Sequence, residues 1–410
     1  MNSSGKTPAE RDAPTRVLFL LATLDGGGAE RTALTLVPHL QARGLDARIG
    51  LLARHGALDG EIDPSRVVLA RVAPGWMSYA PSPGPGRLLA GLSLVPLQQL
   101  DLIRQFRPHV VVSCTAAMNL AALLSTRAYG RRRVAWILRE GNNTRATLED
   151  DTPGRLGRAA RWWATRVVYR APDRVLTISN GVADGLARDF GVPRERVWVL
   201  HNPVEVSRIS RLAQEVDGMR FPPRFIVACG RLHRQKGFDL LLRAFASLRD
   251  ADLALAILGE GPERGHLQAL ARELGIDAQL VMPGFVRNPW AWIAHASAFV
   301  LSSRWEGFGS ILVEAMACGT PVVAADCQYG PREILHDGEA GLLARVDDTD
   351  SLATAIHRVL VDPALRTRLA ARGRLRATDF DAPSIADRYA ELVQEAATLV
   401  RRTSRRTGAP

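Results

Sequence analysis

Two acidic residues lie eight positions apart around a glycine-rich turn in the second half of the sequence. The stretch SSRWEGFGSILVEAMACGTPVVAADC places Glu306 before the turn and Glu314 inside the helix expected after it. Free N–H groups at the start of that helix can bind a phosphate, and they belong to Phe308, Gly309, Ser310 and Ile311. Glu314 is then placed to accept hydrogen bonds from vicinal hydroxyls such as those of a ribose, while Glu306 stays in the loop near a reacting sugar. Each acid alone could be an ordinary cap or helix carboxylate, and it is their combination with the turn that favours a binding site.

A second cluster of charge follows an apolar strand in FIVACGRLHRQKGFDLLLRAF, which contains Gly230, Arg231 and Lys236. Arginine offers a planar fork of N–H groups to phosphate oxygens, and lysine offers a compact mobile charge. Lys6 is the only other lysine in the chain. This pairing suits a diphosphate, although a solvated basic turn is the alternative.

Three glycines follow the first apolar run, in LDGGGAERTALTL, and a helix is expected to start near Ala29. Gly27 and Gly28 let backbone N–H groups approach an anion closely, and the helix N-terminus adds partial positive charge. The spacing is not GxGxxG, and no acid marks a ribose at the usual distance, so a dinucleotide site is disfavoured. A tight turn without a ligand would also explain the glycines.

The elements that must position these residues are short apolar runs that alternate with stretches of helical periodicity, as in a parallel sheet covered by helices. In the first half we expect strands at 17–22, 47–52, 67–72, 110–114, 133–138, 174–178 and 197–200. In the second half we expect them at 224–228, 254–258, 280–282, 298–301, 321–324 and 341–344. Two series of strands predict two Rossmann-like, doubly wound α/β domains facing each other across a cleft.

The expected domain boundaries follow from these series. Residues 16–203 form an N-terminal domain and residues 204–383 a C-terminal domain, and a helix over 384–400 is expected to pack back towards the N-terminal domain. Residues 1–15 and 401–410 are expected to be disordered tails. The Pro- and Gly-rich stretch from 74 predicts a long loop leading into an apolar helix, which could bind an acceptor or a membrane. The alternative is an ordinary surface loop followed by a core helix.

Composition places the chain among globular proteins. Of its 410 residues 47% are hydrophobic and 23% charged, which argues against a disordered or disulfide-scaffold protein. The four cysteines show no paired spacing for zinc or redox chemistry, so a reducing cytosol fits. The N-terminus is polar and does not read as a secretion signal. The uncharged stretch 108–126 is better explained as a buried strand followed by a helix than as a membrane span.

The net charge of +11 is concentrated in the first half, and 11 arginines lie between Arg127 and Arg170. Such a patch suits anionic lipid, a diphosphate or nucleic acid. Trp162 and Trp163 fall inside this patch, where they could dip into a membrane interface or pack into the core.

Together these motifs resemble the retaining glycosyltransferases of family 4, often called group 1, which have the GT-B fold. The resemblance covers nearly the whole chain, and its most specific part is the E-x7-E motif of Glu306 and Glu314. Supporting parts are GRLHRQKG, GEGP, MPGFVRNP and GPREILHDGEAGLLARVDDTDSLATAI. The resemblance implies a nucleotide-diphosphate sugar held by the second domain, an acceptor held by the first, no metal and no other cofactor.

Carried over to this sequence, the resemblance gives each motif a role. Arg231 and Lys236 would neutralise the leaving diphosphate, and Glu306 would hold sugar hydroxyls and stabilise charge at the anomeric carbon. Val286 would contact the base, and Glu314 would bind the ribose. The remaining nucleotide-sugar contacts would come from backbone groups at Gly27, Gly28, Gly230, Phe308, Gly309, Ser310 and Ile311.

One segment departs from the family pattern. Many members carry a histidine after a first-domain strand, whereas this chain reads WILREGNNTRA and offers Arg139, Glu140 and Asn142 as acceptor contacts. This segment and the GPREIL motif resemble those of the subgroup that acts on polyprenyl-diphosphate-linked sugars. We therefore expect transfer of a hexose or N-acetylhexosamine, most readily from UDP, to a lipid-linked saccharide at the inner face of the cytoplasmic membrane.

Two alternatives stay open at this point. One is a related transferase that acts on a soluble acceptor. The other is a nucleic-acid-binding protein that uses the basic first half. The second alternative gives no role to Glu306, Glu314 or Lys236, and the chain lacks the interleaved aromatics of an RNA-binding sheet. Nothing in the sequence predicts the oligomeric state.

Overall fold

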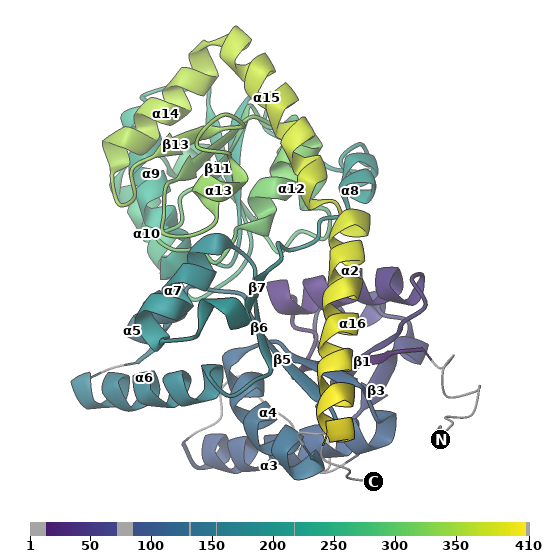
Figure 1. Ribbon diagram of the computed structural model, residues 1–410. Coiled ribbons are helices and arrows are strands. Elements are labelled where there is room, and N and C mark those ends of the chain that lie inside the picture. The colour runs from purple at the N-terminus through teal and green to yellow at the C-terminus, as the bar shows by residue number, and fades with distance from the viewer. Residues whose placement is uncertain (1–13, 72–84, 131–132, 153, 217, 407–410) are drawn as a thin grey trace.

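The computed structural model describes residues 14–71, 85–130, 133–152, 154–216 and 218–406. Two α/β domains are stacked end to end, with the first domain below and the second above in Figure 1. Most of the expected N-terminal tail, the expected loop up to residue 84 and residues 407–410 lie outside the described residues.

The first domain is built on a parallel sheet of seven strands in the order β3-β2-β1-β4-β5-β6-β7. Its central strands β1, β4 and β5 are largely buried, as expected for a parallel sheet with helices on both faces. The strands are β1 Arg16–Leu21, β2 Asp46–Leu51, β3 Val67–Leu69, β4 Val110–Ser113, β5 Ala135–Glu140, β6 Arg174–Thr177 and β7 Val197–Val199. The helices are α2 Gly28–Gln41, α3 Pro85–Phe106, α4 Ala116–Tyr129, α5 Thr144–Asp151, α6 Arg155–Tyr169 and α7 Asn180–Phe190.

The second domain repeats this plan with six parallel strands in the order β10-β9-β8-β11-β12-β13. The strands are β8 Phe225–Cys229, β9 Ala254–Leu258, β10 Leu280–Gly284, β11 Ala298–Leu301, β12 Val322–Ala325 and β13 Leu342–Ala344. The helices are α8 Val206–Leu212, α9 Phe238–Ser247, α10 Arg264–Glu273, α11 Pro289–His295, α12 Ser310–Cys318, α13 Pro331–Ile334, α14 Thr349–Val361 and α15 Pro363–Ala377.

The predicted fold class is confirmed, because every expected strand overlaps a strand of one of these two sheets. In each sheet the strand order reverses once, between β1 and β4 and between β8 and β11. Ligands of doubly wound folds bind beyond the carboxyl ends of strands at such a reversal. The loops that follow β1, β5, β8 and β11 are therefore the ones placed to form a site.

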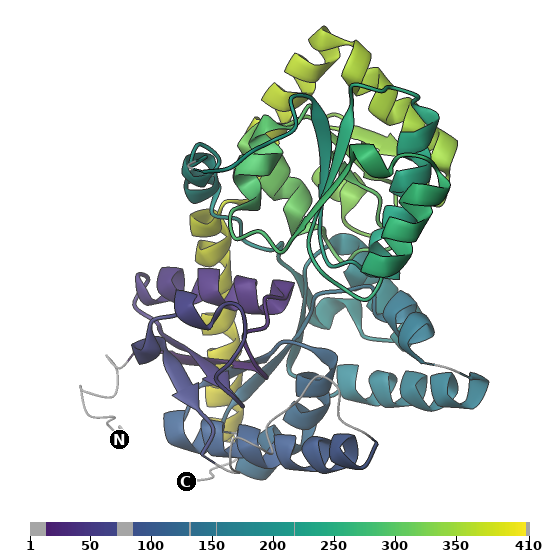
Figure 2. The same cartoon turned by 180° about the vertical axis from the view of Figure 1, so that it is seen from behind.

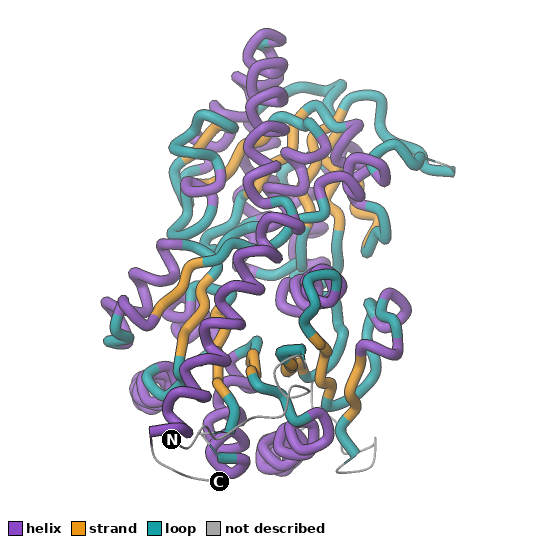
Figure 3. The backbone as a smooth tube through the Cα atoms, turned by 45° about the vertical axis from the view of Figure 1, so that its right-hand side comes forward, coloured by secondary structure: helices purple, strands orange, loops and turns teal. Residues whose placement is uncertain are grey.

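The last helix, α16 Ala382–Arg406, crosses from the second domain to the first, as Figures 1 and 2 show. Ile385, Tyr389 and Val393 join the hydrophobic core of the first domain, where the rings of Tyr389 and Phe19 lie 5.8 Å apart. The side view in Figure 3 shows this helix running beside the strands of the first sheet. The C-terminal segment thus ties the two domains together.

Helix α16 also extends past the expected end at residue 400. Residues 401–406 are helical rather than disordered. The physical reason lies in the sequence, because RRTSRR contains no glycine or proline and the first helix breaker is Gly408.

The uncharged stretch 108–126 forms strand β4 and most of helix α4, as predicted. Among the helices of the described ranges, none is both long enough and apolar enough to cross a membrane.

Candidate functional site

Lys236 and Glu306 form an ion pair at the carboxyl end of the second sheet. Lys236 Nζ lies 2.6 Å from Glu306 Oε1, and the two side chains are 18% and 8% exposed. Ser303 Oγ donates a further hydrogen bond of 2.7 Å to the same carboxylate oxygen. The two loops meet because they follow the adjacent strands β8 and β11. The fold therefore joins two charges that are 70 residues apart in the sequence.

The lysine loop is packed tightly against the loop after β11. Gly237 has a φ of +60°, and a Cβ at this position would collide with the carbonyl of Ser302. Ser302 Oγ donates a 2.8 Å hydrogen bond to the Lys236 carbonyl. On the other side, the stem of Lys236 passes Gly230, where a Cβ would lie 3.3 Å from Lys236 Cε. These contacts fix the direction in which the ammonium points.

Arg231 differs from Lys236 in its surroundings. Its side chain is exposed, and it makes no hydrogen bond or ion pair with any residue that the structure describes. A guanidinium without a carboxylate partner keeps all its donors for an external anion. Of the two predicted phosphate ligands, Arg231 is therefore the one whose charge is not already neutralised within the protein.

Glu314 is partly buried one turn into α12, where it accepts a 2.7 Å hydrogen bond from the indole Nε1 of Trp290. Burial raises the pKa of Glu314, while the Trp290 hydrogen bond and the charge of Arg31 oppose the rise. Arg31 belongs to α2, so the first domain contributes charge to this part of the second domain. Sequence reasoning missed Trp290 and Arg31, because their relation to Glu314 depends on the packing of distant helices.

The turn between Glu306 and α12 presents backbone rather than side-chain groups. Gly309 precedes the helix with a φ of +96°, and no side chain caps the N–H groups that begin at Ser310 and Ile311. Phe308 is buried, and its ring stacks on His201 with centroids 5.3 Å apart. Val286, predicted to meet the base, packs at the edge of the same hydrophobic core.

The glycine loop of the first domain opens α2, with Gly27 as the N-cap and Gly28 as the first helical residue. The carboxylate of Glu30 folds back over Gly27, so the chain itself supplies an anion at this helix start. Burial raises the pKa of Glu30, and Arg139 counteracts part of that rise. Any phosphate at Gly27 would therefore meet the Glu30 carboxylate as well.

Arg139 lies at the end of β5 and is only 4% exposed. Its Nη2 donates to Asn202 Oδ1 and, over 3.2 Å, to Thr32 Oγ1. Asn202 Nδ2 in turn donates a 2.9 Å hydrogen bond to Ser310 Oγ. This bridge links the end of β5 in the first domain to the first residue of α12 in the second.

Glu140 is buried and faces its own loop. It accepts hydrogen bonds from the hydroxyl of Tyr169 and, over 2.9 Å, from the backbone N–H of Asn142. Burial raises the pKa of Glu140, and these donors act in the opposite direction. In the described structure its carboxylate braces the turn that leads to Asn142.

The two domains touch directly at Gly307. Ser179 Oγ of the first domain donates a 2.7 Å hydrogen bond to the Gly307 carbonyl, and a Cβ at Gly307 would lie 2.5 Å from the Gly141 carbonyl oxygen. Ser179 also caps α7 by accepting from the N–H of Val182. The turn after Glu306 thus lies against the loop that follows Arg139 and Glu140 and contains Asn142.

Helix α6 carries an apolar stripe that points away from the protein. Leu156, Trp163 and Val167 lie on one helix face and are 88%, 69% and 40% exposed. Trp162, in contrast, packs inward with its ring centroid 4.7 Å from that of Phe190. Exposed arginines flank the stripe at 155, 166 and 170. Figures 1 and 2 show α6 projecting from the first domain.

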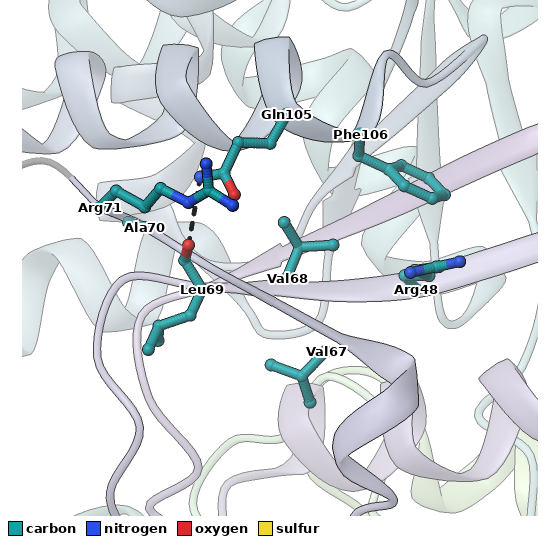
Figure 4. Close-up of a pocket in the computed structure, with 8 residues that line it drawn as sticks. All are labelled: Arg48, Val67, Val68, Leu69, Ala70, Arg71, Gln105 and Phe106. Carbon is teal, nitrogen blue, oxygen red and sulfur yellow. Dashed lines mark hydrogen bonds between the residues drawn. The ribbon is translucent and has the colours of Figure 1, made fainter.

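Hollows also lie outside the ion-pair loops. One of about 540 Å³ lies at the edge strand β3, where Arg48, Arg71 and Phe106 line it, and it contains none of the predicted site residues (Figure 4). Another of about 720 Å³ lies between the domains and is lined by residues of both, including His201 and Glu333. Within the described ranges, no group of three or more His, Cys, Asp or Glu residues is placed to hold a metal ion.

Two models of protein families match the chain. The model described as Glycosyl transferases group 1 matches residues 215–376, and the model described as Glycosyltransferase Family 4 matches residues 26–208. Each match covers most of one structural domain, and the two together include every predicted site residue.

Curated relatives are also similar to this chain. N-acetylgalactosamine-N,N'-diacetylbacillosaminyl-diphospho-undecaprenol 4-alpha-N-acetylgalactosaminyltransferase of Campylobacter jejuni is 28% identical over 375 residues, 90% of this chain and 96% of that protein. The lipopolysaccharide core biosynthesis glycosyltransferase LpsE of Rhizobium meliloti is 32% identical over 233 residues, 56% of this chain and 67% of that protein.

Solved structures share the fold. Anabaena HepE in complex with UDP and glucose is 20% identical with a TM-score of 0.73, and the match covers 93% of this chain and 100% of that one. WaaG, a glycosyltransferase involved in lipopolysaccharide biosynthesis, is 18% identical with a TM-score of 0.70, over 92% and 99% of the two chains.

Proposed function

Because the chain belongs to the GT-B glycosyltransferases of family 4, or group 1, we propose that it transfers a hexose or N-acetylhexosamine from a nucleotide-diphosphate sugar to a lipid-linked saccharide. The donor nucleotide is UDP, the anomeric configuration is retained, and the product enters lipopolysaccharide or another surface polysaccharide. The observation that carries the donor half of this proposal is the Lys236–Glu306 pair beside the uncapped start of α12.

A departing diphosphate needs a preorganised positive field. Arg231 brings an uncompensated guanidinium, the N–H groups of α12 bring partial positive charge, and Lys236 can exchange its bond to Glu306 for a bond to phosphate. These groups supply the charge without a metal ion, which is why we propose a metal-independent reaction. Glu306, released by Lys236, is then free to accept a hydrogen bond from a sugar hydroxyl.

Glu314 is proposed to bind the ribose, because a carboxylate can accept hydrogen bonds from both vicinal hydroxyls. The Trp290 indole N–H holds one of its oxygens and so orients the group. Val286, at the edge of the neighbouring hydrophobic core, would meet the base.

The acceptor half of the proposal is supported by the relative from Campylobacter jejuni, whose name gives a diphospho-undecaprenol-linked saccharide as its substrate. Arg139 and Glu140 end strand β5, and Asn142 follows in the loop that touches Gly307. This segment is proposed to supply the acceptor contacts. The exposed stripe of α6, with its flanking arginines, would bring this domain to an anionic membrane surface. We place the enzyme at the inner face of the cytoplasmic membrane.

The test is a binding and turnover experiment with purified protein. UDP is expected to raise the melting temperature in the presence of EDTA, since a ligand that binds only the folded state stabilises it. A panel of sugar nucleotides, read by release of nucleoside diphosphate, then identifies the donor. Absence of a thermal shift with every nucleoside diphosphate would refute the proposal, and NMR of the product would show whether the configuration is retained.

A further inference from the structure

Tyr329 is a residue of the second domain whose side chain packs in the first. It lies in the loop between β12 and α13, yet its ring contacts the hydrophobic core of the first domain. The ring fills a slot on α7 that exists because Gly181 and Gly185 lack side chains. A Cβ at Gly181 would lie 3.0 Å from Tyr329 Cγ, and one at Gly185 would lie 2.9 Å from Tyr329 Cζ.

Polar contacts hold the same loop on the first domain. Arg188 Nη2 on α7 donates a 3.1 Å hydrogen bond to the Tyr329 hydroxyl, and Asn143 Nδ2 donates one of 3.2 Å to Gln328 Oε1. Four residues after Tyr329, Glu333 accepts from the backbone N–H of Asn180 over 3.0 Å and from its side chain over 2.8 Å. The loop and helix α13 thus contact α7 from Asn180 to Arg188.

The other side of this loop touches the turn that carries Glu306. Gly330 lies so close to Phe308 that an added Cβ would be 2.7 Å from Phe308 Cα, and Gln328 pairs with Trp305 in an isolated β-bridge. Tyr329 itself adopts a φ of +71°. Positive φ is unfavourable for a bulky side chain, so the contacts on both sides must compensate for it.

We propose that Tyr329 is a positioning residue for sugar transfer, which docks on α7 and holds the acceptor domain against the Glu306–Phe308 turn. This inference rests on the proposed function, because transfer requires the donor groups of one domain to meet an acceptor held by the other. Tyr329 touches no substrate in this scheme. It acts through the Gly307–Gly141 contact, where a displacement of about 1 Å can lower the rate by about 100-fold.

The decisive variant is Gly185→Ala, which removes no group and fills the slot. Alanine is a better helix former than glycine, so α7 itself should become more stable. We expect kcat to fall by about 10- to 100-fold, the radius of gyration from X-ray scattering to rise, and the Kd for UDP to change less than about threefold. Gly265→Ala is the matched control, because Gly265 is also helical and has no atom near its Cβ position.

A double-mutant cycle assigns the effect to Tyr329. Tyr329→Ala should lower kcat to a similar extent, and adding Gly185→Ala to it should cause no further loss, because the slot is then empty. Tyr329→Phe should give an intermediate kcat, since the ring stays and the Arg188 hydrogen bond is lost. Additive losses, or wild-type kcat and scattering in Gly185→Ala, would overturn the inference.

Failure of the proposed function would look different. If the wild-type protein neither binds UDP nor turns over any sugar nucleotide, the proposed function is wrong. The scattering measurements on Gly185→Ala and Gly265→Ala would still decide whether Tyr329 holds the domains together.

Discussion

The Lys236 ammonium lies 2.6 Å from Glu306 Oε1, so the cation proposed to meet the diphosphate and the acid proposed to meet the sugar neutralise each other. Both side chains are largely removed from solvent. Removing one member of a buried pair leaves an uncompensated charge, whereas replacing both by neutral groups can be nearly neutral for stability. The pair therefore allows its effects on folding and on catalysis to be separated.

Lys236→Met is expected to lower kcat by about 100- to 1,000-fold, because the leaving diphosphate loses a preorganised cation. The same variant should lose about 3 kcal/mol of unfolding free energy, since Glu306 stays buried and unpaired. The double variant Lys236→Met/Glu306→Gln should regain most of that stability and none of the activity. Urea unfolding and steady-state kinetics measure the two effects, with Arg243→Ala as a surface control. A double variant that recovers activity would contradict the assigned roles.

Glu314 should make UDP binding sensitive to pH in the acidic range. Burial raises its pKa, so as the pH falls the carboxylate is protonated earlier than an ordinary glutamate, for which the pKa is about 4.3. The effect of Glu314 on stability runs the other way from its effect on UDP binding. Burial disfavours the charged carboxylate, so the free energy of unfolding decreases as the pH rises through the raised pKa of Glu314.

The measurement is the ratio of UDP affinities of wild type and Glu314→Gln between pH 8 and pH 5, which cancels the titration of UDP itself. At pH 8 we expect the wild type to bind UDP about 10- to 100-fold more tightly than Glu314→Gln does, because hydrogen bonds to a charged acceptor contribute about 1.5–3 kcal/mol. The ratio should fall towards one as the pH decreases. A ratio that is constant over this range would show that the charge of Glu314 is not used in binding.

The fold could be predicted from the sequence because apolar runs and helical periodicity are local signals. The motifs also led to the prediction that Glu306, Glu314, Arg231 and Lys236 are site residues, and their roles stay a prediction. The partners of these residues could not be predicted, because Trp290 meets Glu314 only after α11 packs on α12, and the Lys236–Glu306 bond depends on β8 and β11 being neighbours. The effect of the Arg31 charge on Glu314 and the contacts of Tyr329 depend further on how one domain lies on the other.

The bridge from Arg139 through Asn202 to Ser310 should couple the domains during catalysis. Asn202→Ala removes an acceptor from a buried guanidinium and a donor to Ser310, so we expect a loss of about 1–3 kcal/mol in unfolding free energy. The value of kcat should fall more than the affinity for UDP, because Arg231, Lys236 and Glu314 are untouched. Calorimetric UDP titration and kinetics test this, with exposed Gln268→Ala as control. Unchanged kcat in a folded Asn202→Ala protein would show that the bridge is only structural.

The exposed stripe of α6 should bind anionic membranes. Its residues Leu156 and Trp163 point into solvent, and the arginines at 155, 166 and 170 add charge beside them. We expect the wild type to co-sediment with vesicles that contain anionic lipid and not with neutral vesicles. The bound fraction should decrease at high salt.

The matched pair of variants separates the apolar stripe from general hydrophobicity. Leu156→Ser/Trp163→Ser should abolish sedimentation with anionic vesicles without changing UDP binding, because both side chains are exposed and neither contacts Lys236 or Glu306. Leu375→Ser is the control, since Leu375 is 74% exposed on α15 of the second domain and should have no effect. An equal loss of vesicle binding in the double variant and in Leu375→Ser would indicate unspecific adsorption. If the double variant co-sediments like the wild type, α6 does not contact the membrane.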